Sequence, residues 1–170
     1  RDDIELIAVS EEKRKDPKAR AACINASDYT FLSLPDTAAR EAVSLVTNEH
    51  VRIIDASTAH RTNPDWAYGF PELSKEYRRK IAASGRVAVP GCYASGFAAC
   101  VYPLTNYHVI TPDYPVCCHA VSGYSGAGKK AIAVYESAER PASYDSPRQY
   151  ALSQAHKHLP EMKAVSGLLY

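Results

Sequence analysis

The sequence lacks an excess of charge of either sign, a long apolar run and an internal repeat. Its 170 residues carry a formal net charge of +1, so nothing in its charge favours nucleic acid or an anionic membrane. No apolar stretch is long enough to cross a bilayer, and the first residues show no signal-peptide pattern. We therefore expect a cytoplasmic protein that binds small molecules, with no nucleic acid and no membrane among its partners.

Cysteine is present, but in no pattern that indicates a disulfide framework or a metal centre. The five cysteines are an odd number and include neither a Cys-x-x-Cys pair nor zinc-like spacing. We therefore expect reduced thiols and no bound metal. A hydrophobic fraction of 46% and a charged fraction of 23% are ordinary for a globular protein.

Strand-like and helix-like stretches alternate along the chain. Apolar runs typical of buried strands lie at 4–9, 29–34, 51–55, 86–89 and 116–121. Helices are expected at 18–25, at 37–46 with Asp36 as its N-cap, at 74–84, at 94–101 closed by Pro103, and at 131–137. This alternation predicts right-handed βαβ units, and hence an α/β fold with a parallel sheet. Ligands of such sheets gather at the carboxyl ends of the strands.

One turn at such an end carries a candidate nucleophile. Cys92 follows Pro90 and Gly91, where an expected strand ends and a helix of small residues begins. Backbone N–H groups at a helix N-terminus favour the thiolate, which is the form that attacks a carbonyl. Free cysteine is also a common apolar packing residue, and the turn alone leaves both interpretations open. The packing interpretation is kept for Cys23, Cys100, Cys117 and Cys118.

The loop at 55–61 gathers polar side chains after another expected strand. Asp55, Ser57, Thr58, His60 and Arg61 are suited to a polar ligand. The planar guanidinium of Arg61 fits a phosphate or a carboxylate in particular. The alternative is a turn whose side chains hydrogen-bond to their own backbone.

Two further stretches have the composition of anion-binding sites. The loop after the first expected strand holds Ser10, Lys13 and Arg14, which could bind the 2′-phosphate of NADP, although the residues by themselves favour a solvated charge run. The stretch 122–130 places three glycines, two serines and two lysines between an expected strand and an expected helix. Its spacing is not that of a Walker loop.

A histidine cluster supplies a candidate for proton transfer. His156 and His158 flank Lys157, with Glu161 nearby, whereas no third metal ligand is evident. A structural role for these histidines is the alternative. Combined with Cys92 and the anion-binding loops, the cluster fits one chemistry: a cysteine attacks an acyl phosphate, phosphate leaves, and a nicotinamide hydride reduces the thioester to an aldehyde.

Five motifs together resemble one family. They lie at 55–61, 67–72, 90–96, 122–130 and 155–162, and read Asp-Ala-Ser-Thr-Ala-His-Arg, Ala-Tyr-Gly-Phe-Pro-Glu, Pro-Gly-Cys-Tyr-Ala-Ser-Gly, Ser-Gly-Tyr-Ser-Gly-Ala-Gly-Lys-Lys and Ala-His-Lys-His-Leu-Pro-Glu-Met. In this order they resemble the N-acetyl-gamma-glutamyl-phosphate reductases, the second, short type most of all. The resemblance implies NADPH-dependent reduction of N-acetyl-glutamyl 5-phosphate to the 5-semialdehyde in arginine synthesis.

The resemblance also assigns roles and domains. Cys92 matches the nucleophile, His156 the acid–base residue, and Arg61 with Ser57 the substrate site. Cofactor contacts fall on Leu34, Pro35, Ser122, Gly123, Gly126 and Gly128. The implied fold is a partial Rossmann-like parallel sheet at 1–91, joined at 92–170 to the start of an α+β catalytic domain, in a protein that forms a homodimer or homotetramer at full length.

The chain departs from the family pattern in two ways. Val89 stands where the family usually has an asparagine, whose amide could orient the substrate carbonyl or steady the thiolate. The family's opening strand with its Gly-rich pyrophosphate loop is not among these residues, nor is the second half of the catalytic domain. We therefore expect the middle of a longer protein, which by itself binds NADPH poorly. The alternatives are an aspartate-semialdehyde type of dehydrogenase, a cysteine hydrolase and a non-catalytic truncated chain.

Overall fold

The computed structural model describes residues 3–150, 152–153 and 155–169. It divides into two compact units, each of which is considered by itself. The larger unit comprises the described residues of 1–114 and 157–170, and the smaller unit comprises those of 115–156. These two units do not test the predicted boundary between a dinucleotide-binding domain and a catalytic domain at residues 91 and 92, which stays a prediction.

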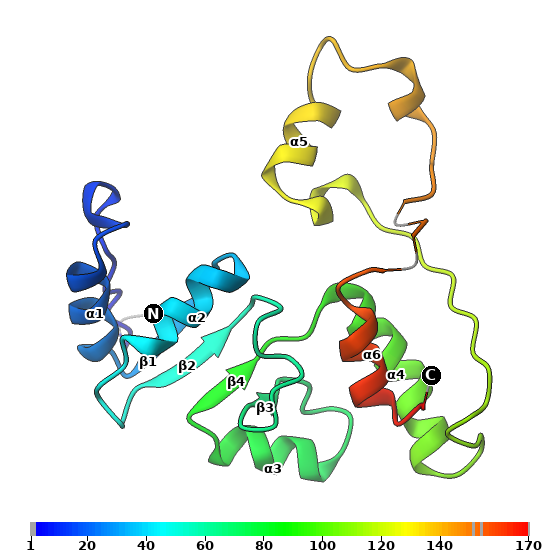
Figure 1. Cartoon of the computed structure of the whole chain (residues 1–170), viewed down its shortest axis with the longest axis horizontal. Coiled ribbons are helices and arrows are strands. Elements are labelled where there is room, and N and C mark those ends of the chain that lie inside the picture. Colours follow the sequence, from blue (N-terminus) through cyan, green and yellow to red (C-terminus); the bar gives the residue numbers. More distant parts are fainter. Residues whose placement is uncertain (1–2, 151, 154, 170) are drawn as a thin grey trace. The chain divides into compact units, whose positions relative to one another are not determined.

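A four-stranded parallel sheet organises the larger unit (Figure 1). Its strands are β1 (Tyr29–Leu32), β2 (Arg52–Asp55), β3 (Ala67–Tyr68) and β4 (Arg86–Ala88), in the order β1-β2-β4-β3. β1 pairs with β2 from Tyr29 opposite Arg52 to Leu32 opposite Asp55. All pairings are parallel, which confirms the predicted α/β fold and brings the carboxyl ends of the strands to one edge.

Helices connect and flank these strands. They are α1 (Pro17–Asn25), α2 (Asp36–Ser44), α3 (Lys75–Ala83), α4 (Cys92–Asn106) and α6 (Leu159–Ser166). A short 3-10 turn at Glu11–Lys13 precedes α1. Polar caps begin two of them: the Asp16 carboxylate accepts the N–H of Lys18, and the Ser74 hydroxyl accepts the N–H of Tyr77.

Two apolar clusters hold the larger unit together. The first joins α1 and α2 to the sheet through the buried side chains of Ile24, Leu32, Ala42, Val51 and Ile53. The second packs Tyr68 of β3 against Ala98 of α4 and Val165 of α6. The Thr105 hydroxyl donates to the Ser166 carbonyl over 2.5 Å and ties α4 to α6 again. These contacts bring a helix from the end of the chain beside the helix that starts at Cys92.

The smaller unit has no buried side chain among its described residues. Its elements are a 3-10 turn at Tyr124–Ala127, α5 (Lys129–Tyr135) and a second 3-10 turn at Ala142–Asp145. The Tyr135 ring stacks on Tyr124 at 4.8 Å and meets Tyr144 edge-on at 4.7 Å. The Arg148 guanidinium lies 3.8 Å from the centre of the Tyr144 ring. Local ring contacts therefore order this unit without a core of its own.

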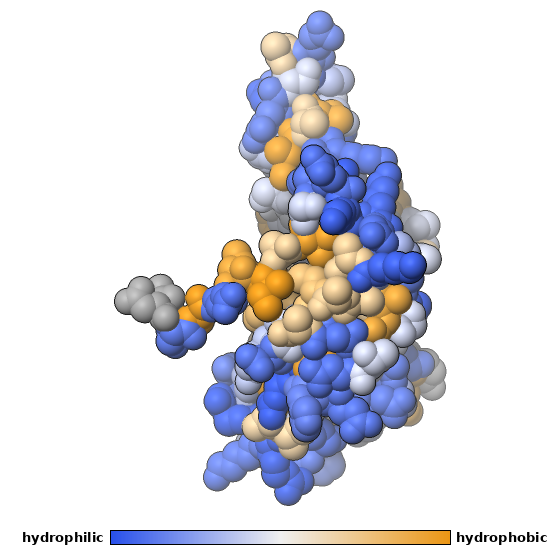
Figure 2. Space-filling model, turned by 90° about the vertical axis from the view of Figure 1, so that its left-hand side faces the viewer, coloured by the Kyte–Doolittle hydropathy of each residue, from blue (hydrophilic) through white to orange (hydrophobic). Residues whose placement is uncertain are grey.

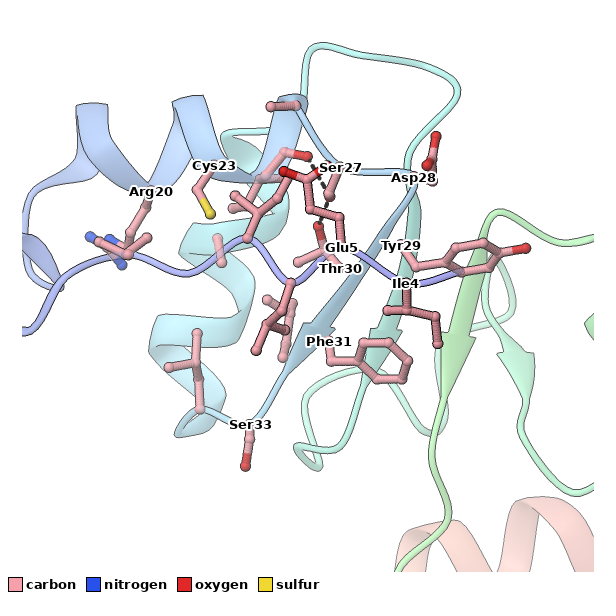
Figure 3. Close-up of a pocket in the computed structure, with 18 of the residues that line it drawn as sticks. Ile4, Glu5, Arg20, Cys23, Ser27, Asp28, Tyr29, Thr30, Phe31 and Ser33 are labelled. Atoms are coloured by element: carbon pink, nitrogen blue, oxygen red, sulfur yellow. Dashed lines mark hydrogen bonds between the residues drawn. The ribbon is translucent and has the colours of Figure 1, made fainter. Parts of the chain in front are cut away.

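Two predicted strands are absent from the structure. Residues 4–9 and 116–121 form no strand, because a strand requires a neighbour for its backbone groups and neither segment has one within the described part of the chain. Residues 3–7 and 9 instead border a largely apolar groove of about 890 Å³ beside β1 (Figure 3). Ile4, Leu6 and Phe31 stay 63%, 88% and 73% exposed there. Apolar side chains also gather at the centre of the mostly hydrophilic face in Figure 2.

Two helix boundaries differ from the prediction. Pro103 does not close α4, which continues through it to Asn106. Asp36 is the first residue of α2 instead of its N-cap, a place taken by Pro35. The Asp36 carboxylate accepts hydrogen bonds from Thr58 in the loop after β2, so it does not cap the N–H groups of its own helix.

Candidate active site

The loop after β2 is fixed by its own side chains. Asp55 is fully buried, and its carboxylate accepts hydrogen bonds from the Ser57 N–H over 2.9 Å and from the Ser57 hydroxyl over 2.7 Å. The same carboxylate lies 2.6 Å from Nδ1 of His60, whose ring stacks on Trp66 at 4.0 Å. The alternative interpretation, side chains bonded to the backbone of their own turn, therefore describes Asp55 and also Ser57, whose hydroxyl accepts the Ala59 N–H. His60 is held by a side chain instead, and a substrate contact by Ser57 stays a prediction.

Arg61 connects that loop to the turn after β4. Its Nε donates to the Val89 carbonyl over 2.8 Å, and its Nη2 to the Ala56 carbonyl over 3.0 Å. Its Nη1 donates to Oε2 of Glu161 over 3.1 Å. A guanidinium has five N–H donors, so two remain for the predicted phosphate contact. The bond to position 89 uses the backbone and so tolerates valine in place of asparagine.

A second link joins the loops after β1 and β2. The Asp36 carboxylate accepts the N–H of Thr58 over 3.0 Å and also its hydroxyl. The Thr58 hydroxyl is the main reason that the pKa of Asp36 lies below its usual value of 3.8. This link holds the turn that carries Leu34 and Pro35, two predicted cofactor contacts, at the carboxyl edge of the sheet. Leu34 also lines the groove beside β1.

Cys92 is the first residue of α4 and is exposed. Gly91 is the N-cap, and its carbonyl accepts the Ser95 N–H over 2.8 Å and the Ser95 hydroxyl over 2.9 Å. The predicted strand–turn–helix arrangement is confirmed. The packing interpretation of Cys92 is wrong, because an exposed thiol fills no core. Cys100, Cys117 and Cys118 are exposed as well, so the packing interpretation is wrong for these three cysteines too.

Glu161 is the buried group at the centre of this turn. It lies in the first turn of α6 and is 1% exposed. Its Oε1 accepts the Gly91 N–H over 2.7 Å and the Tyr68 hydroxyl over 2.8 Å, while Oε2 accepts from Arg61. Burial, and then the bond to Glu161, raise the pKa of Tyr68 well above its usual value. The sequence placed Glu161 near the histidines but gave no sign of these partners.

His158, the second histidine of the triplet, lies against the same turn. It is buried, and a Cβ added to Gly91 would stand 2.6 Å from its Nε2. Its ring lies 6.1 Å from that of Tyr93. His156 belongs to the smaller unit, where its ring lies 6.0 Å from that of Tyr150. The larger unit thus brings a histidine to the residue before Cys92, and the motif's paired histidines were the signal for it.

The remaining predicted cofactor residues lie together in the smaller unit. Ser122, Gly123, Gly126 and Gly128 form an exposed loop that leads into α5. Gly128 has φ +84°, a left-handed conformation that favours glycine. The predicted loop–helix arrangement is confirmed, and contact with a cofactor stays a prediction. Within the described residues, no group of three His, Cys, Asp or Glu side chains is arranged as a metal site.

Comparison with known families agrees with this architecture. Residues 5–81 match the family described as the NAD binding domain of semialdehyde dehydrogenase, and residues 92–169 match its dimerisation domain. None of the described helices is long and apolar enough to span a bilayer. Among solved structures, none gives a significant match.

The chain is also similar to curated proteins with one name in common. It is 49% identical to N-acetyl-gamma-glutamyl-phosphate reductase of Burkholderia ambifaria, over 100% of this chain and 54% of the relative. It is 47% identical to N-acetyl-gamma-glutamyl-phosphate reductase 2 of Pseudomonas putida and 49% identical to that of a Nostoc species, over 99% of this chain and 53% of each relative. The chain therefore spans about half the length of the curated relatives that it matches.

Proposed function

Because the chain belongs to the semialdehyde dehydrogenase family, we propose that it is part of an NADPH-dependent reductase of N-acetyl-glutamyl 5-phosphate. The product would be N-acetyl-glutamate 5-semialdehyde. The observation that carries the proposal is the exposed Cys92 at the start of α4, on a turn held by Glu161 and bordered by His158.

Cys92 would act as the nucleophile. Its thiolate attacks the acyl carbon of the substrate, the carbon–oxygen bond to phosphate breaks, and a thioester to Sγ remains. Bound NADPH would supply a hydride to that thioester. Once its oxygen is protonated, the resulting hemithioacetal breaks its bond to Sγ and releases the aldehyde, and its hydroxyl proton returns Cys92 to the thiol. The departing phosphate takes its proton from water. The two N–H donors that remain on Arg61 would hold the departing phosphate.

A histidine would move the protons, and the geometry of the larger unit favours His158. Its Nε2 borders Gly91, next to the nucleophile, where it can take the thiol proton and return a proton to the hemithioacetal oxygen. The assignment to His156 rests on the motif alone.

The carboxyl edge of the sheet fits a nicotinamide cofactor. Leu34 and Pro35 follow β1 there, in a turn fixed through Asp36 and Thr58, and nucleotides bind at this edge of parallel sheets. A preference for NADP rests on Ser10, Lys13 and Arg14, although Arg14 already pairs with Glu11 over 2.6 Å. A homo-oligomer is supported by the match to a dimerisation domain, and a cytosol-like compartment by the free thiols.

The test is the reverse reaction in the complete protein. We expect phosphate-dependent reduction of NADP by N-acetyl-glutamate 5-semialdehyde, with aspartate semialdehyde inert. Cys92→Ser should abolish it, whereas Cys100→Ser, an exposed cysteine of the same helix, should leave it unchanged. A folded but inactive wild-type protein would favour the non-catalytic alternative, and activity that survives Cys92→Ser would remove Cys92 as the nucleophile.

A further inference from the structure

Oε1 of Glu161 receives two donors from different parts of the larger unit. The Gly91 N–H reaches it from the N-cap of α4, and the Tyr68 hydroxyl reaches it from β3. Both bonds are buried, where hydrogen bonds to a carboxylate are strong and costly to lose. The position of this oxygen therefore determines where the backbone next to Cys92 lies.

Arg61 cannot fix that oxygen by itself. A guanidinium orients a carboxylate best through two parallel bonds. In this structure only Nη1 of Arg61 reaches Glu161, and it contacts Oε2, because Nε and Nη2 are bonded to the carbonyls of Val89 and Ala56. Oε1 accepts from two described partners, the Gly91 N–H and the Tyr68 hydroxyl. Of these two, only Tyr68 lies outside the turn that carries Cys92.

The Tyr68 ring has contacts that do not need its hydroxyl. The ring packs in the second apolar cluster and meets Tyr77 edge-on at 6.3 Å. Phenylalanine would keep these contacts and remove only the bond to Glu161. Tyr77 offers a matched control, because it lies against the same cluster and makes no hydrogen bond to Glu161.

We propose that Tyr68 is a positioning residue for Cys92, which acts by holding Oε1 of Glu161 against the N–H of Gly91. The proposal deepens the proposed function, since it assumes that Cys92 is the reactive group. The test of this proposal uses neither substrate nor cofactor. The positioning role of Tyr68 can therefore be refuted while the reductase activity is confirmed, and the reductase activity can be refuted while the positioning role is confirmed.

The test compares amide exchange in the wild type, Tyr68→Phe and Tyr77→Phe. We expect Tyr68→Phe to speed exchange of the Gly91 amide about tenfold. The Gly69 amide serves as the internal reference, because it follows Tyr68 directly and is bonded to the Ala88 carbonyl over 2.8 Å. It should be unchanged, and Tyr77→Phe should alter neither amide. Equal acceleration of both amides would show that Tyr68 only stabilises the fold, and acceleration of neither would show that its hydroxyl does not hold the Gly91 amide in place.

Alkylation of Cys92 by iodoacetamide gives a second measurement. It is followed in a chain whose other four cysteines, Cys23, Cys100, Cys117 and Cys118, are replaced by serine. Tyr68→Phe should slow the reaction about threefold, because a loosened turn no longer holds the thiol at the helix N-terminus. An unchanged rate overturns the proposal. If Tyr68→Phe does not fold, Glu161→Met takes its place, because methionine lacks the carboxylate oxygen that accepts the Gly91 N–H. Unaltered protection of the Gly91 amide in that variant overturns the proposal equally.

Discussion

Gly91 and His158 approach so closely that position 91 has no room for a side chain. A Cβ at this position would stand 2.6 Å from Nε2 of His158 and 2.6 Å from Nη1 of Arg61. The backbone itself makes no such demand, because φ is −70° there, an ordinary value for any residue. Glycine is therefore required by the close approach of these two side chains.

Gly91→Ala should consequently destabilise the chain and displace the site. We expect a loss of about 1–3 kcal/mol in the free energy of unfolding, as for other overpacked positions. Gly96→Ala is the control, since a Cβ there meets nothing within 4 Å and lies within α4. It should stabilise by about 0.5–1 kcal/mol. Urea unfolding measures both, and a neutral Gly91→Ala would contradict the packing shown here.

The two histidines of the triplet can be separated by substitution in the complete protein. His158→Gln should lower kcat by about 10²–10⁴-fold, the usual contribution of a general acid–base. His156→Gln should have a much smaller effect if its ring serves only its own unit. Initial rates of the two variants and the wild type decide between the two histidines, and circular dichroism checks that each variant keeps the wild-type fold. A large loss in His156→Gln alone would restore the assignment made from the motif.

The buried Asp55 should be intolerant of amide substitution. Asp55→Asn keeps the shape but turns one acceptor into a donor that faces Ser57 or His60. We expect a loss of about 1–3 kcal/mol in stability. Asp65→Asn, an exposed position of the following loop, should change stability by less than about 0.5 kcal/mol. Similar midpoints for the two variants in urea unfolding would argue against a structural role for Asp55.

The bond between Thr58 and Asp36 should appear in the pH dependence of stability. The pKa of Asp36 is lowered on folding, so the bond stabilises the folded state above about pH 4 and the effect is lost as the pH falls through the folded pKa. Thr58→Val should remove about 0.5 kcal/mol or less at pH 6, since Asp36 is exposed and screened, and less than that at pH 2, where the carboxyl group is protonated to a greater extent. Thr37→Val, on the same helix as Asp36, should show no such pH dependence. An equal loss at both pH values for Thr58→Val would assign the effect to packing.

The sequence predicts those parts of the fold that depend on residues close to one another along the chain. Apolar runs located β1, β2 and β4 to within two residues, because each strand places an apolar side chain in the buried interior: Leu32, Ile53 and Ala88. The same pattern failed at 4–9 and 116–121, where strand formation depends on a partner that no local signal describes. Pro103 failed as a stop signal because packing of α4 on α6 outweighs one lost backbone bond.

The candidate site shows the same division. The thiol of Cys92 was found because its turn is local, and Arg61 was found because its charge follows a strand. What Arg61 does could not be read from the sequence, since its partner Glu161 lies 100 positions away. Likewise, the choice between His156 and His158 depends on which unit each one joins, and adjacent positions in a motif carry no information on that.

The bond between Gly91 and Glu161 also sets an order of events during synthesis. The two residues are 70 positions apart, so at about 5–20 residues per second a ribosome makes Glu161 roughly 4–14 s after Gly91. During that interval Cys92 exists on a nascent chain whose turn has no carboxylate to close on. The turn that carries the Cys92 thiol is therefore completed late, after the sheet that supports it can already have formed.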